Sequence, residues 1–383
     1  MQGGGSPFDR ARPGPSSECC VASAAWWVCA GGVCTGWLCT GWVSSAGVRV
    51  CARFAIMGGV MKWFSPAKIN LTLKVLGRQP DGFHALDSVV VPITLGDDVV
   101  VEKARASSLT LHSDTVDLSE MPSNPEKNLA FRALRALEVE VGRALPTAMI
   151  IEKRIPLGGG LGGGSSNAAT VLRAVNALWE LGISQARLCE IGAALGSDVP
   201  LFVLDGTVRM RGRGEWVERI PMKDAPPLTL VLANDGTHCS TPQVYGALNA
   251  PMLRNILTNG TDIWHTLCLL LRKGDSEQVS MQVLNDLQMP CLKLFPGVAR
   301  TAEALRAAGC KGVTLCGSGA TVFAPVGSLE EGENVLAYPA LSHCRRACVQ
   351  TLPDGVMAAH GPLTPIVMVR IHVGQPPTAS ENN

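Results

Sequence analysis

The sequence lacks any strong excess of charge of one sign. Lysine and arginine together number 33 and aspartate and glutamate 32, so the formal net charge is +1. A basic patch or stripe is the electrostatic mark of a nucleic-acid surface, and none is indicated here. We therefore expect neither a nucleic-acid partner nor a strongly charged protein partner.

Paired cysteines at metal-binding spacing are also missing. None of the 14 cysteines forms a Cys-x-x-Cys pair, and the spacing of Cys29, Cys34 and Cys39 is unlike that of zinc sites. After residue 60 the cysteines are scattered singly, apart from Cys344 and Cys348. Scattered thiols are typical of reduced proteins, so we predict a cytoplasmic protein without metal-ligating residues.

The N-terminal segment is poor in charge. No charged residue occurs from Cys19 to Val48, a length that would allow a membrane span, but glycines and hydroxyl residues interrupt the stretch. The segment also lacks the basic and apolar order of a signal peptide. Because Met57 and Met61 are both candidate starts, we predict that residues 1–60 are not part of the working protein and that no membrane is involved. A membrane anchor is the alternative.

Glycine, in contrast, is concentrated in one place. Six of the seven residues from Gly158 to Gly164 are glycine, and a helical stripe follows at residues 168–178. Glycine costs conformational entropy, so the run indicates that a large group approaches the backbone. A glycine loop that leads into a helix N-terminus presents N–H groups and a positive dipole end, which suit a phosphate.

Other interpretations of this loop exist. It lacks the Gly-Lys-Ser or Gly-Lys-Thr ending of a Walker A loop. Its Gly158-x-Gly160-x-x-Gly163 spacing also fits a dinucleotide-binding fingerprint, with Glu180 near the place of the acidic ribose ligand. A flexible linker without function is disfavoured, because strand and helix patterns flank the loop closely.

Polar and apolar residues alternate strictly from Lys68 to Val75, which predicts a half-buried strand. Lys68 and Asn70 share its polar face, where a plain solvated surface is the alternative to a functional site. Elsewhere the patterns predict strands at 89–91, 99–101, 148–151, 208–217 and 228–232, with turns at Asp81-Gly82 and Gly96-Asp97. They predict helices at 128–140, 188–195, 262–271 and 298–308.

Two further polar segments stand out. Gly196 has the position of a C′ glycine after a helix, and Asp198 could simply be the N-cap of the next helix, with Pro200 in its first turn. Gly317-Ser318-Gly319 lies between two apolar runs and by itself predicts only a hairpin.

Taken together, these segments resemble the GHMP small-molecule kinases. Five segments occur in the order of that family: Pro66-Ala67-Lys68-Ile69-Asn70, Asp81-Gly82-Phe83-His84, Pro156 to Ala169, Gly196 to Pro200 and Gly317-Ser318-Gly319. The first two are similar to those of the 4-diphosphocytidyl-2-C-methyl-D-erythritol kinases, which act in non-mevalonate isoprenoid biosynthesis. The similarity covers roughly residues 61–324.

The resemblance implies an α/β (α+β) fold with two domains and an active site in the cleft between them. Residues 61–222 would form the ATP-binding domain, with the glycine loop in a left-handed βαβ unit rather than in a dinucleotide-binding fold. Residues 228–352 would form a ferredoxin-like α/β sandwich, and residues 353–383 a tail. The resemblance leaves open whether the protein forms a homodimer.

The resemblance also implies transfer of the γ-phosphoryl group of ATP to the 2-hydroxyl of the methylerythritol moiety. Asp198 would accept the hydroxyl proton, and Lys68 would stabilise the developing negative charge. The serine hydroxyls at the helix start would bind phosphate or Mg²⁺. The implied ATP-binding residues are Pro156, Leu157, Gly158, Gly159, Gly160, Leu161, Gly162, Gly163, Gly164, Ser165 and Ser166.

The implied residues for the cytidine substrate are Asn70, Phe83, His84, Thr241 and Tyr245. His84 would hydrogen-bond cytosine and Tyr245 would cover the base. Phe83 stands where many members have tyrosine, so stacking would survive and a phenol hydrogen bond would not. The alternatives are a mevalonate or homoserine kinase, an inactive ligand-binding relative, and an NAD-dependent oxidoreductase.

Overall fold

The computed structural model describes residues 60–80, 82–248, 263–354 and 371–372. The predictions for residues 1–59, for Asp81 and for most of the tail therefore lie outside the described residues. The described residues belong to one compact unit, residues 52–383. Within the described ranges, no helix combines the length and apolar character that a bilayer span requires.

The first sheet has seven strands, in the order β3-β4-β2-β1-β8, and β2 also pairs with the β5–β6 hairpin. Strands β1 and β2 are antiparallel, whereas β8 pairs with β1 in parallel. The strands are β1 (Val60–Arg78), β2 (His84–Lys103), β3 (Ser108–His112), β4 (Thr147–Glu152), β5 (Val208–Gly212), β6 (Trp216–Arg219) and β8 (Leu284–Asn285).

Strand β1 contains the predicted alternation, but it is buried on both faces. The apolar side chains of Ile69 and Leu71 are fully buried, and Lys68 and Asn70 on the opposite face are only 5% and 1% exposed. The expectation of a half-buried strand is therefore wrong. The polar face is covered because glycine-rich segments lie against Lys68: a Cβ atom at residue 162 would lie 3.1 Å from Lys68 Cγ, and one at residue 317 would lie 3.3 Å from Lys68 Nζ.

Strand β2 is continuous, so the predicted turn at Gly96-Asp97 is also wrong. Gly96 pairs with Pro66 within the sheet. A Cβ atom at residue 96 would lie 2.5 Å from Cε2 of the Phe64 ring and 2.7 Å from the Ser65 carbonyl oxygen. Glycine is required here by close packing of the neighbouring strand, and not by a reversal of the chain.

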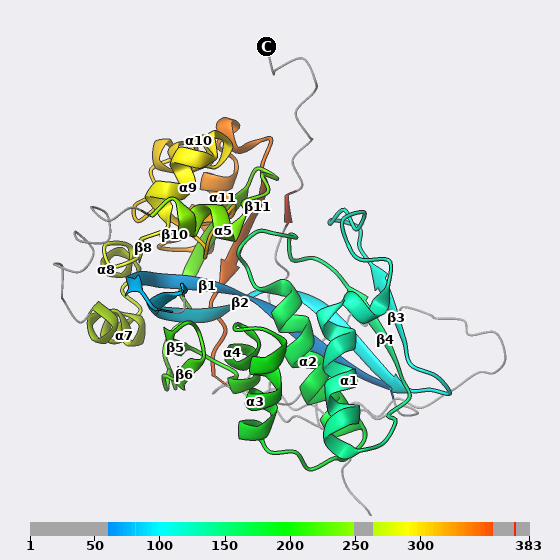
Figure 1. Cartoon of the computed structure of the whole chain (residues 1–383). Coiled ribbons are helices and arrows are strands. Elements are labelled where there is room, and N and C mark those ends of the chain that lie inside the picture. The colour runs from blue at the N-terminus through cyan, green and yellow to red at the C-terminus, as the bar shows by residue number, and fades with distance from the viewer. Residues whose placement is uncertain (1–59, 81, 249–262, 355–370, 373–383) are drawn as a thin grey trace, which may run out of the picture. The chain divides into compact units, whose positions relative to one another are not determined.

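Helices cover one side of the first sheet (Figure 1), and α2 contacts both β1 and β2. The predicted helix at 128–140 is confirmed, and the side chain of Asn128 caps it by accepting a hydrogen bond from the Ala130 N–H. The elements are η1 (Pro125–Lys127), α1 (Leu129–Val141), α2 (Gly163–Leu178), α3 (Gln185–Leu195) and α4 (Val199–Leu204). The apolar stripe of α2 is buried as predicted: Ala168, Val171, Leu172, Val175 and Leu178.

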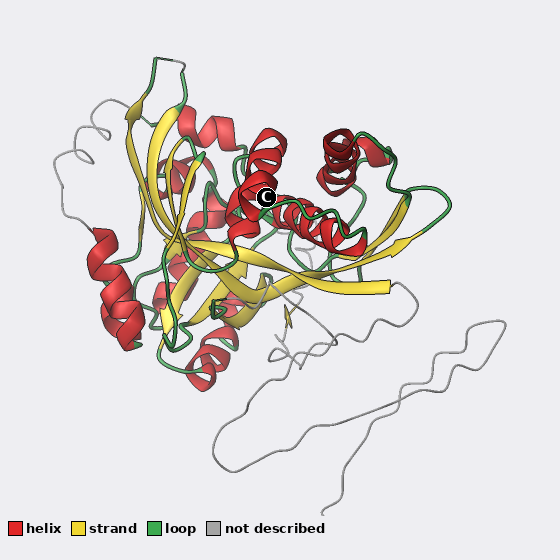
Figure 2. Cartoon of the chain, turned by 90° about the horizontal axis from the view of Figure 1, so that it is seen from below, coloured by secondary structure: helices red, strands yellow, loops and turns green. Residues whose placement is uncertain are grey.

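The second sheet has five strands in the order β12-β11-β7-β10-β9, and each neighbouring pair is antiparallel. Its strands are β7 (Thr229–Asn234), β9 (Thr314–Leu315), β10 (Val322–Val326), β11 (Arg345–Gln350) and β12 (Ile371–His372). The remaining elements are α5 (Thr241–Gly246), α7 (Ile263–Lys273), α8 (Ser276–Ser280), α9 (Gln288–Leu294), α10 (Pro296–Ala307), α11 (Leu329–Leu336) and η2 (Pro339–Leu341). Figure 2 shows the strands of both sheets with helices packed beside them.

The two sheets are joined through the chain that follows β11. Thr351 forms an antiparallel bridge with Ile93 of β2, and the Leu352 N–H donates to the Pro92 carbonyl oxygen at 2.9 Å. Strand β8 is a second connection. It lies in sequence between β7 and β9 of the second sheet, but it pairs with β1 of the first sheet. These contacts hold the elements around the cavity described next.

Candidate active site

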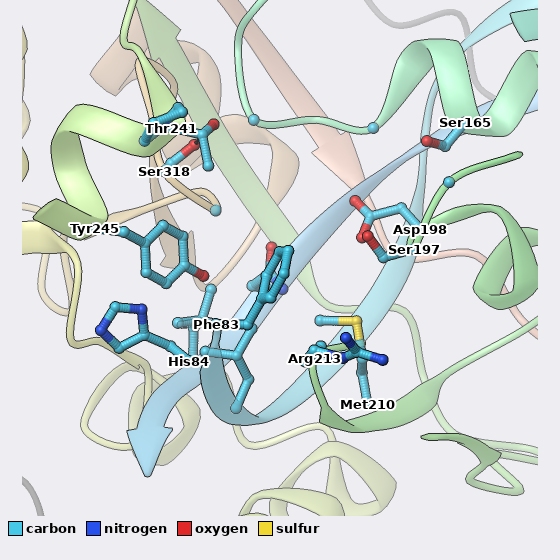
Figure 3. Close-up of a pocket in the computed structure, with 18 of the residues that line it drawn as sticks. Phe83, His84, Ser165, Ser197, Asp198, Met210, Arg213, Thr241, Tyr245 and Ser318 are labelled. Atoms are coloured by element: carbon cyan, nitrogen blue, oxygen red, sulfur yellow. Dashed lines mark hydrogen bonds between the residues drawn. The ribbon is translucent and has the colours of Figure 1, made fainter. Parts of the chain in front are cut away.

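One large cavity, of about 960 Å³, is lined by residues of the first sheet, of helices α2 and α5, and of the turns after β5 and β9. Figure 3 shows His84 and Tyr245 at one end, and Ser165, Ser197 and Asp198 at the other. The cavity wall includes ten of the predicted site residues: Lys68, Asn70, Phe83, His84, Gly160, Gly162, Ser165, Asp198, Thr241 and Tyr245. Segments far apart in the sequence therefore meet at a single hollow.

The Lys68 side chain is held in a fixed position on β1. Its Nζ donates a hydrogen bond to Asn70 Oδ1 at 2.6 Å, and Asn70 Nδ2 donates to Ser88 Oγ at 2.9 Å. Ser88 Oγ in turn donates to the Thr72 carbonyl oxygen at 2.6 Å. This chain of bonds turns the amide oxygen of Asn70 towards the lysine, so Asn70 orients Lys68 as well as lining the cavity.

Asp198 occupies the N-cap position of α4, but its side chain makes no capping hydrogen bond. Its Oδ2 lies 3.9 Å from Lys68 Nζ, and the carboxylate side chain is 32% exposed. The carboxylate is therefore available to a ligand rather than used as a cap. Gly196, two residues earlier, has an extended backbone with φ of 178°, so it is not the left-handed C′ glycine that the sequence predicts.

The glycine loop, defined here as residues 156–162, leads into α2. Gly162 is the N-cap of α2 with φ of 72° and offers no capping side chain, and the first intrahelical bond runs from the Ser166 N–H to the Gly162 carbonyl oxygen. The preceding N–H groups of the first turn have no partner within the helix, as at every helix start. Since Gly160, Gly162 and Ser165 line the cavity, this positive helix end faces it.

Close packing of the protein itself accounts for part of the glycine run. A Cβ atom at residue 159 would lie 2.8 Å from Thr321 Oγ1, and one at residue 160 would overlap the Cys316 carbonyl oxygen. The buried Cys316 thiol donates to the Gly160 carbonyl oxygen at 3.3 Å. The segment between β9 and β10 thus packs directly against the loop. This packing requires glycine independently of any ligand.

The other predicted ATP-binding residues do not line the cavity: Pro156, Leu157, Gly158, Gly159, Leu161, Gly163, Gly164 and Ser166. Ser166 is fully buried, and its hydroxyl lies 2.8 Å from Ser65 Oγ. Of the two serines, only Ser165 therefore has its side chain placed at the cavity.

Aromatic groups gather at the far end of the cavity (Figure 3). The rings of His84 and Tyr245 lie 5.2 Å apart with an interplanar angle of 30°, and Phe83 is 60% exposed. Partial burial, and then the charge of Arg78, hold the pKa of His84 below its ordinary value. Burial, and then the negative charge of Asp198, raise the pKa of Tyr245 to about 12. Both side chains are therefore uncharged at neutral pH.

Several cavity residues are missing from the sequence-based prediction. Arg213 is the most informative, because its guanidinium lies 5.4 Å from the centre of the Phe83 ring. The sequence suggests one strand over 208–217, but Gly212 and Gly214 have positive φ values and reverse the chain between β5 and β6. The Gly-x-Gly spacing around Arg213 was the available signal for this hairpin.

The Gly317-Ser318-Gly319 turn also enters the site. It joins β9 to β10 as the predicted hairpin, and Gly317 and Ser318 line the cavity. Ser318 Oγ lies 2.7 Å from Thr241 Oγ1, so the turn contacts the start of α5.

The cavity wall carries more positive than negative charge. Among the described residues that line it, Asp198 is the only acid, whereas Lys68, Arg78 and Arg213 are basic. Across the described part of the chain, no group of three or more His, Cys, Asp or Glu residues is arranged to hold a metal ion. The arrangement suits an anionic ligand with a single carboxylate beside it.

Family models match two parts of the chain. Residues 128–206 match the GHMP kinases N terminal domain, and residues 270–340 match the GHMP kinases C terminal model. The first match includes the glycine loop and Asp198, and the second includes the Gly317-Ser318-Gly319 turn. Together with the solved structures below, they confirm the two-domain GHMP kinase fold.

Curated relatives match over most of their length. A 4-diphosphocytidyl-2-C-methyl-D-erythritol kinase of Pelotomaculum thermopropionicum is 37% identical over 271 residues, which is 71% of this chain and 91% of the relative. The enzyme of the same name from Moorella thermoacetica is 39% identical over 257 residues, or 67% of this chain and 86% of the relative.

Solved structures agree at the level of the fold. A crystal structure of 4-(cytidine 5'-diphospho)-2C-methyl-D-erythritol kinase aligns with a TM-score of 0.63 at 30% identity, covering 79% of this chain and 100% of that one. Mevalonate kinase of L. major aligns with a TM-score of 0.60 at 15% identity, covering 80% of this chain and 99% of that one. At 15% identity the second match shows the fold alone.

Proposed function

Because the chain belongs to the 4-diphosphocytidyl-2-C-methyl-D-erythritol kinase family, we propose that it transfers the γ-phosphoryl group of ATP to the 2-hydroxyl of 4-diphosphocytidyl-2-C-methyl-D-erythritol. This reaction belongs to non-mevalonate isoprenoid biosynthesis. The observation that carries the proposal is the pairing of Lys68 and Asp198, 3.9 Å apart, between a helix N-terminus and an aromatic end of the same cavity.

In the proposed reaction, Asp198 accepts the proton of the substrate hydroxyl as its oxygen attacks the γ-phosphorus. The bond from that phosphorus to the β,γ-bridging oxygen breaks, and ADP leaves. Lys68, oriented by Asn70, stabilises the negative charge that develops on the attacking and phosphoryl oxygens. Positioned general-base assistance is typically worth about 10²–10⁴-fold in rate.

The ATP phosphates would lie against the glycine loop and the first turn of α2, where backbone N–H groups and the helix dipole favour anions. Mg²⁺ would accompany ATP and neutralise charge on the β- and γ-phosphates. The donor set fits this role, because Ser165 offers a hydroxyl at the cavity and Mg²⁺ usually takes few protein ligands besides phosphate oxygens and water.

The cytidine group would occupy the aromatic end. Neutral His84 offers one ring N–H and one ring acceptor to the edge of cytosine, and Tyr245 and Phe83 offer faces for stacking. Arg78 and Arg213, which also line this cavity, would attract the diphosphate. Thr241 is a further candidate for contact with the substrate, through the hydroxyl that it directs towards Ser318.

Three wider predictions go with this function. The working chain would comprise an ATP-binding domain over residues 61–222 and a second domain over 228–352, with residues 1–60 and 353–383 outside them. It would act in the cytoplasm. A homodimer stays a prediction, which sedimentation of the purified chain would check.

The deciding experiment measures ADP release by the purified full chain with ATP, Mg²⁺ and 4-diphosphocytidyl-2-C-methyl-D-erythritol. Mevalonate and homoserine serve as competing acceptors, because kinases for both alcohols share this fold. We expect turnover with the cytidine substrate alone. Turnover with mevalonate or homoserine would replace the proposal by the alternative substrate, and folded protein without turnover on any acceptor would indicate an inactive binding relative.

A further inference from the structure

A buried group of polar side chains lies beneath the glycine loop, outside the cavity. Asp97 is fully buried on β2, and its carboxylate forms an ion pair with Lys153, whose side chain is 2% exposed. Asn167 of α2 joins them, since its Oδ1 accepts from Lys153 Nζ at 2.9 Å and its Nδ2 donates to Asp97 Oδ2 at 2.9 Å. None of these three residues lines the cavity, so none contacts the substrates directly.

One oxygen of Asp97 holds the chain that enters the glycine loop. Asp97 Oδ1 accepts hydrogen bonds from the backbone N–H groups of Arg154 at 2.7 Å and Ile155 at 2.9 Å. These two residues connect the end of β4 to the loop. A carboxylate that accepts two backbone N–H bonds fixes both the position and the direction of that segment.

The other oxygen of Asp97 holds the chain that leaves the loop. Through Asn167 it reaches the second turn of α2, and Asn167 Nδ2 also donates to Ser65 Oγ at 2.9 Å. Ser65 Oγ lies 2.8 Å from Ser166 Oγ, so two successive residues of α2 are tied to the same group. Both ends of the glycine loop are therefore attached to one carboxylate.

Stability alone does not explain this arrangement. Burying an ion pair carries a desolvation penalty, and replacing such a pair by apolar residues of similar size is often neutral or stabilising. The pair instead holds a helix start whose N–H groups face the cavity, where small displacements of binding groups are costly. From these contacts we propose that Asp97, acting through Lys153 and Asn167, is a positioning residue that aligns the glycine loop and the start of α2 for the phosphates of ATP.

This inference rests on the proposed function, because it assigns the ATP phosphates to the loop. It predicts a selective defect. Replacing Asp97 by Asn keeps an oxygen for the two backbone N–H groups but turns an N–H donor towards Lys153 and Asn167, which releases the α2 side of the loop. Asn167→Ala removes only the link to α2 and leaves the ion pair intact.

The experiment measures the dissociation constants of a non-hydrolysable ATP analogue with Mg²⁺, and of 4-diphosphocytidyl-2-C-methyl-D-erythritol, together with KM for each substrate. For full-length Asp97→Asn and Asn167→Ala, we expect the affinity for the ATP analogue to fall by about tenfold to 10²-fold, the scale of a displacement of about 1 Å. The affinity for the cytidine substrate should not change.

A matched control is Asp205→Asn, which removes the acid of another buried pair that involves α2: Arg173 of α2 and Asp205 at the end of α4, with 3.6 Å between Arg173 Nη2 and Asp205 Oδ2. It should lower stability without a selective loss of ATP affinity. Asn tolerates the positive φ of 58° at residue 205.

Two results would overturn the inference. One is unchanged affinity for the ATP analogue in folded Asp97→Asn or Asn167→Ala, and the other is an equal loss for both substrates. Should Asp97→Asn fail to fold, Asn167→Ala alone decides. Wild-type protein that neither binds nor phosphorylates the cytidine substrate would instead refute the proposed function.

Discussion

The Asp198 carboxylate is the only acid among the described residues of the cavity wall, and its position next to Lys68 makes it the natural proton acceptor. We expect Asp198→Asn to lose about 10²–10⁴-fold in kcat, the usual worth of a general base, because the amide cannot take the proton. ATP affinity should be retained, since the glycine loop is untouched. Single-turnover assays and analogue binding measure the two quantities, and near-normal turnover would exclude Asp198 as the base.

His84 gives the site a pH dependence with a definite sign. Partial burial and the charge of Arg78 lower its pKa below the ordinary 6.5, so the neutral ring persists to lower pH than in a free peptide. KM for the cytidine substrate should stay flat above pH 6.5 and rise only as the pH falls through the lowered pKa. The unfolded chain takes up the proton first, so this group also makes stability fall as the pH drops below 6.5.

The check is KM of the cytidine substrate across acidic and neutral pH for wild type and for His84→Gln, whose side chain hydrogen-bonds but does not titrate. In the variant, KM for the cytidine substrate should no longer rise as the pH falls. If the rise in KM at acidic pH persists unchanged in His84→Gln, another group causes it.

For individual residues, the sequence best predicts the placement of those on regular helices and strands. The alternation along β1 places Lys68 and Asn70 on one face, and in the structure Lys68 Nζ donates a hydrogen bond to Asn70 Oδ1 at 2.6 Å. Arg213 was not found in this way, because its place depends on the β5–β6 hairpin, whose only sequence signal is the pair Gly212 and Gly214. Asp97 appeared to belong to a turn, because glycine-aspartate pairs usually mark one, and its partners lie 56 and 70 residues away.

Among the elements, β2 depends on glycine in its middle. Gly96→Ala would place a methyl group within van der Waals overlap of the Phe64 ring and the Ser65 carbonyl oxygen. Because the neighbouring strand has little room to move, we expect a loss of about 1–3 kcal/mol in the free energy of unfolding, typical of overpacking. Denaturant titration of the two proteins measures the difference.

The matched control is Gly246→Ala. A Cβ atom at residue 246 meets nothing within 4 Å, and the residue is helical. Alanine there should be neutral or slightly stabilising, because it restricts the unfolded chain. Equal effects at the two positions would show that packing around Gly96 does not decide the outcome.

Helix patterns were easier to predict than strand patterns in this chain. The apolar stripe of α2 and the helix pattern at residues 128–140 are local signals, and both agree with the structure. The extents of β1 and β2 are not local, because each strand depends on partners from distant parts of the chain. For this reason the turn expected at Gly96-Asp97 is part of a strand, and the polar face of β1, expected at the surface, is buried.

For the whole molecule, the described fold begins at Val60, where β1 starts opposite Glu102 of β2. We therefore expect a chain that starts at Met61 to keep the kcat and KM of the full chain, because among the described residues it loses only Val60, the first residue of a paired strand. Steady-state kinetics of the two proteins side by side is the measurement. A large loss of activity or of soluble protein would show that residues 1–60 are needed.

Strand β8 also has a consequence for how the protein is made. Its neighbour Asp286 accepts a hydrogen bond from the Val75 N–H, 211 residues earlier in the chain. A ribosome that adds about 5–20 residues per second needs roughly 10–40 seconds to cover that separation. During this interval the edge of β1 that pairs with β8 has no partner strand, and an unpaired strand edge can pair with other chains. Completion of the first sheet is thus timed by translation of the second half of the protein.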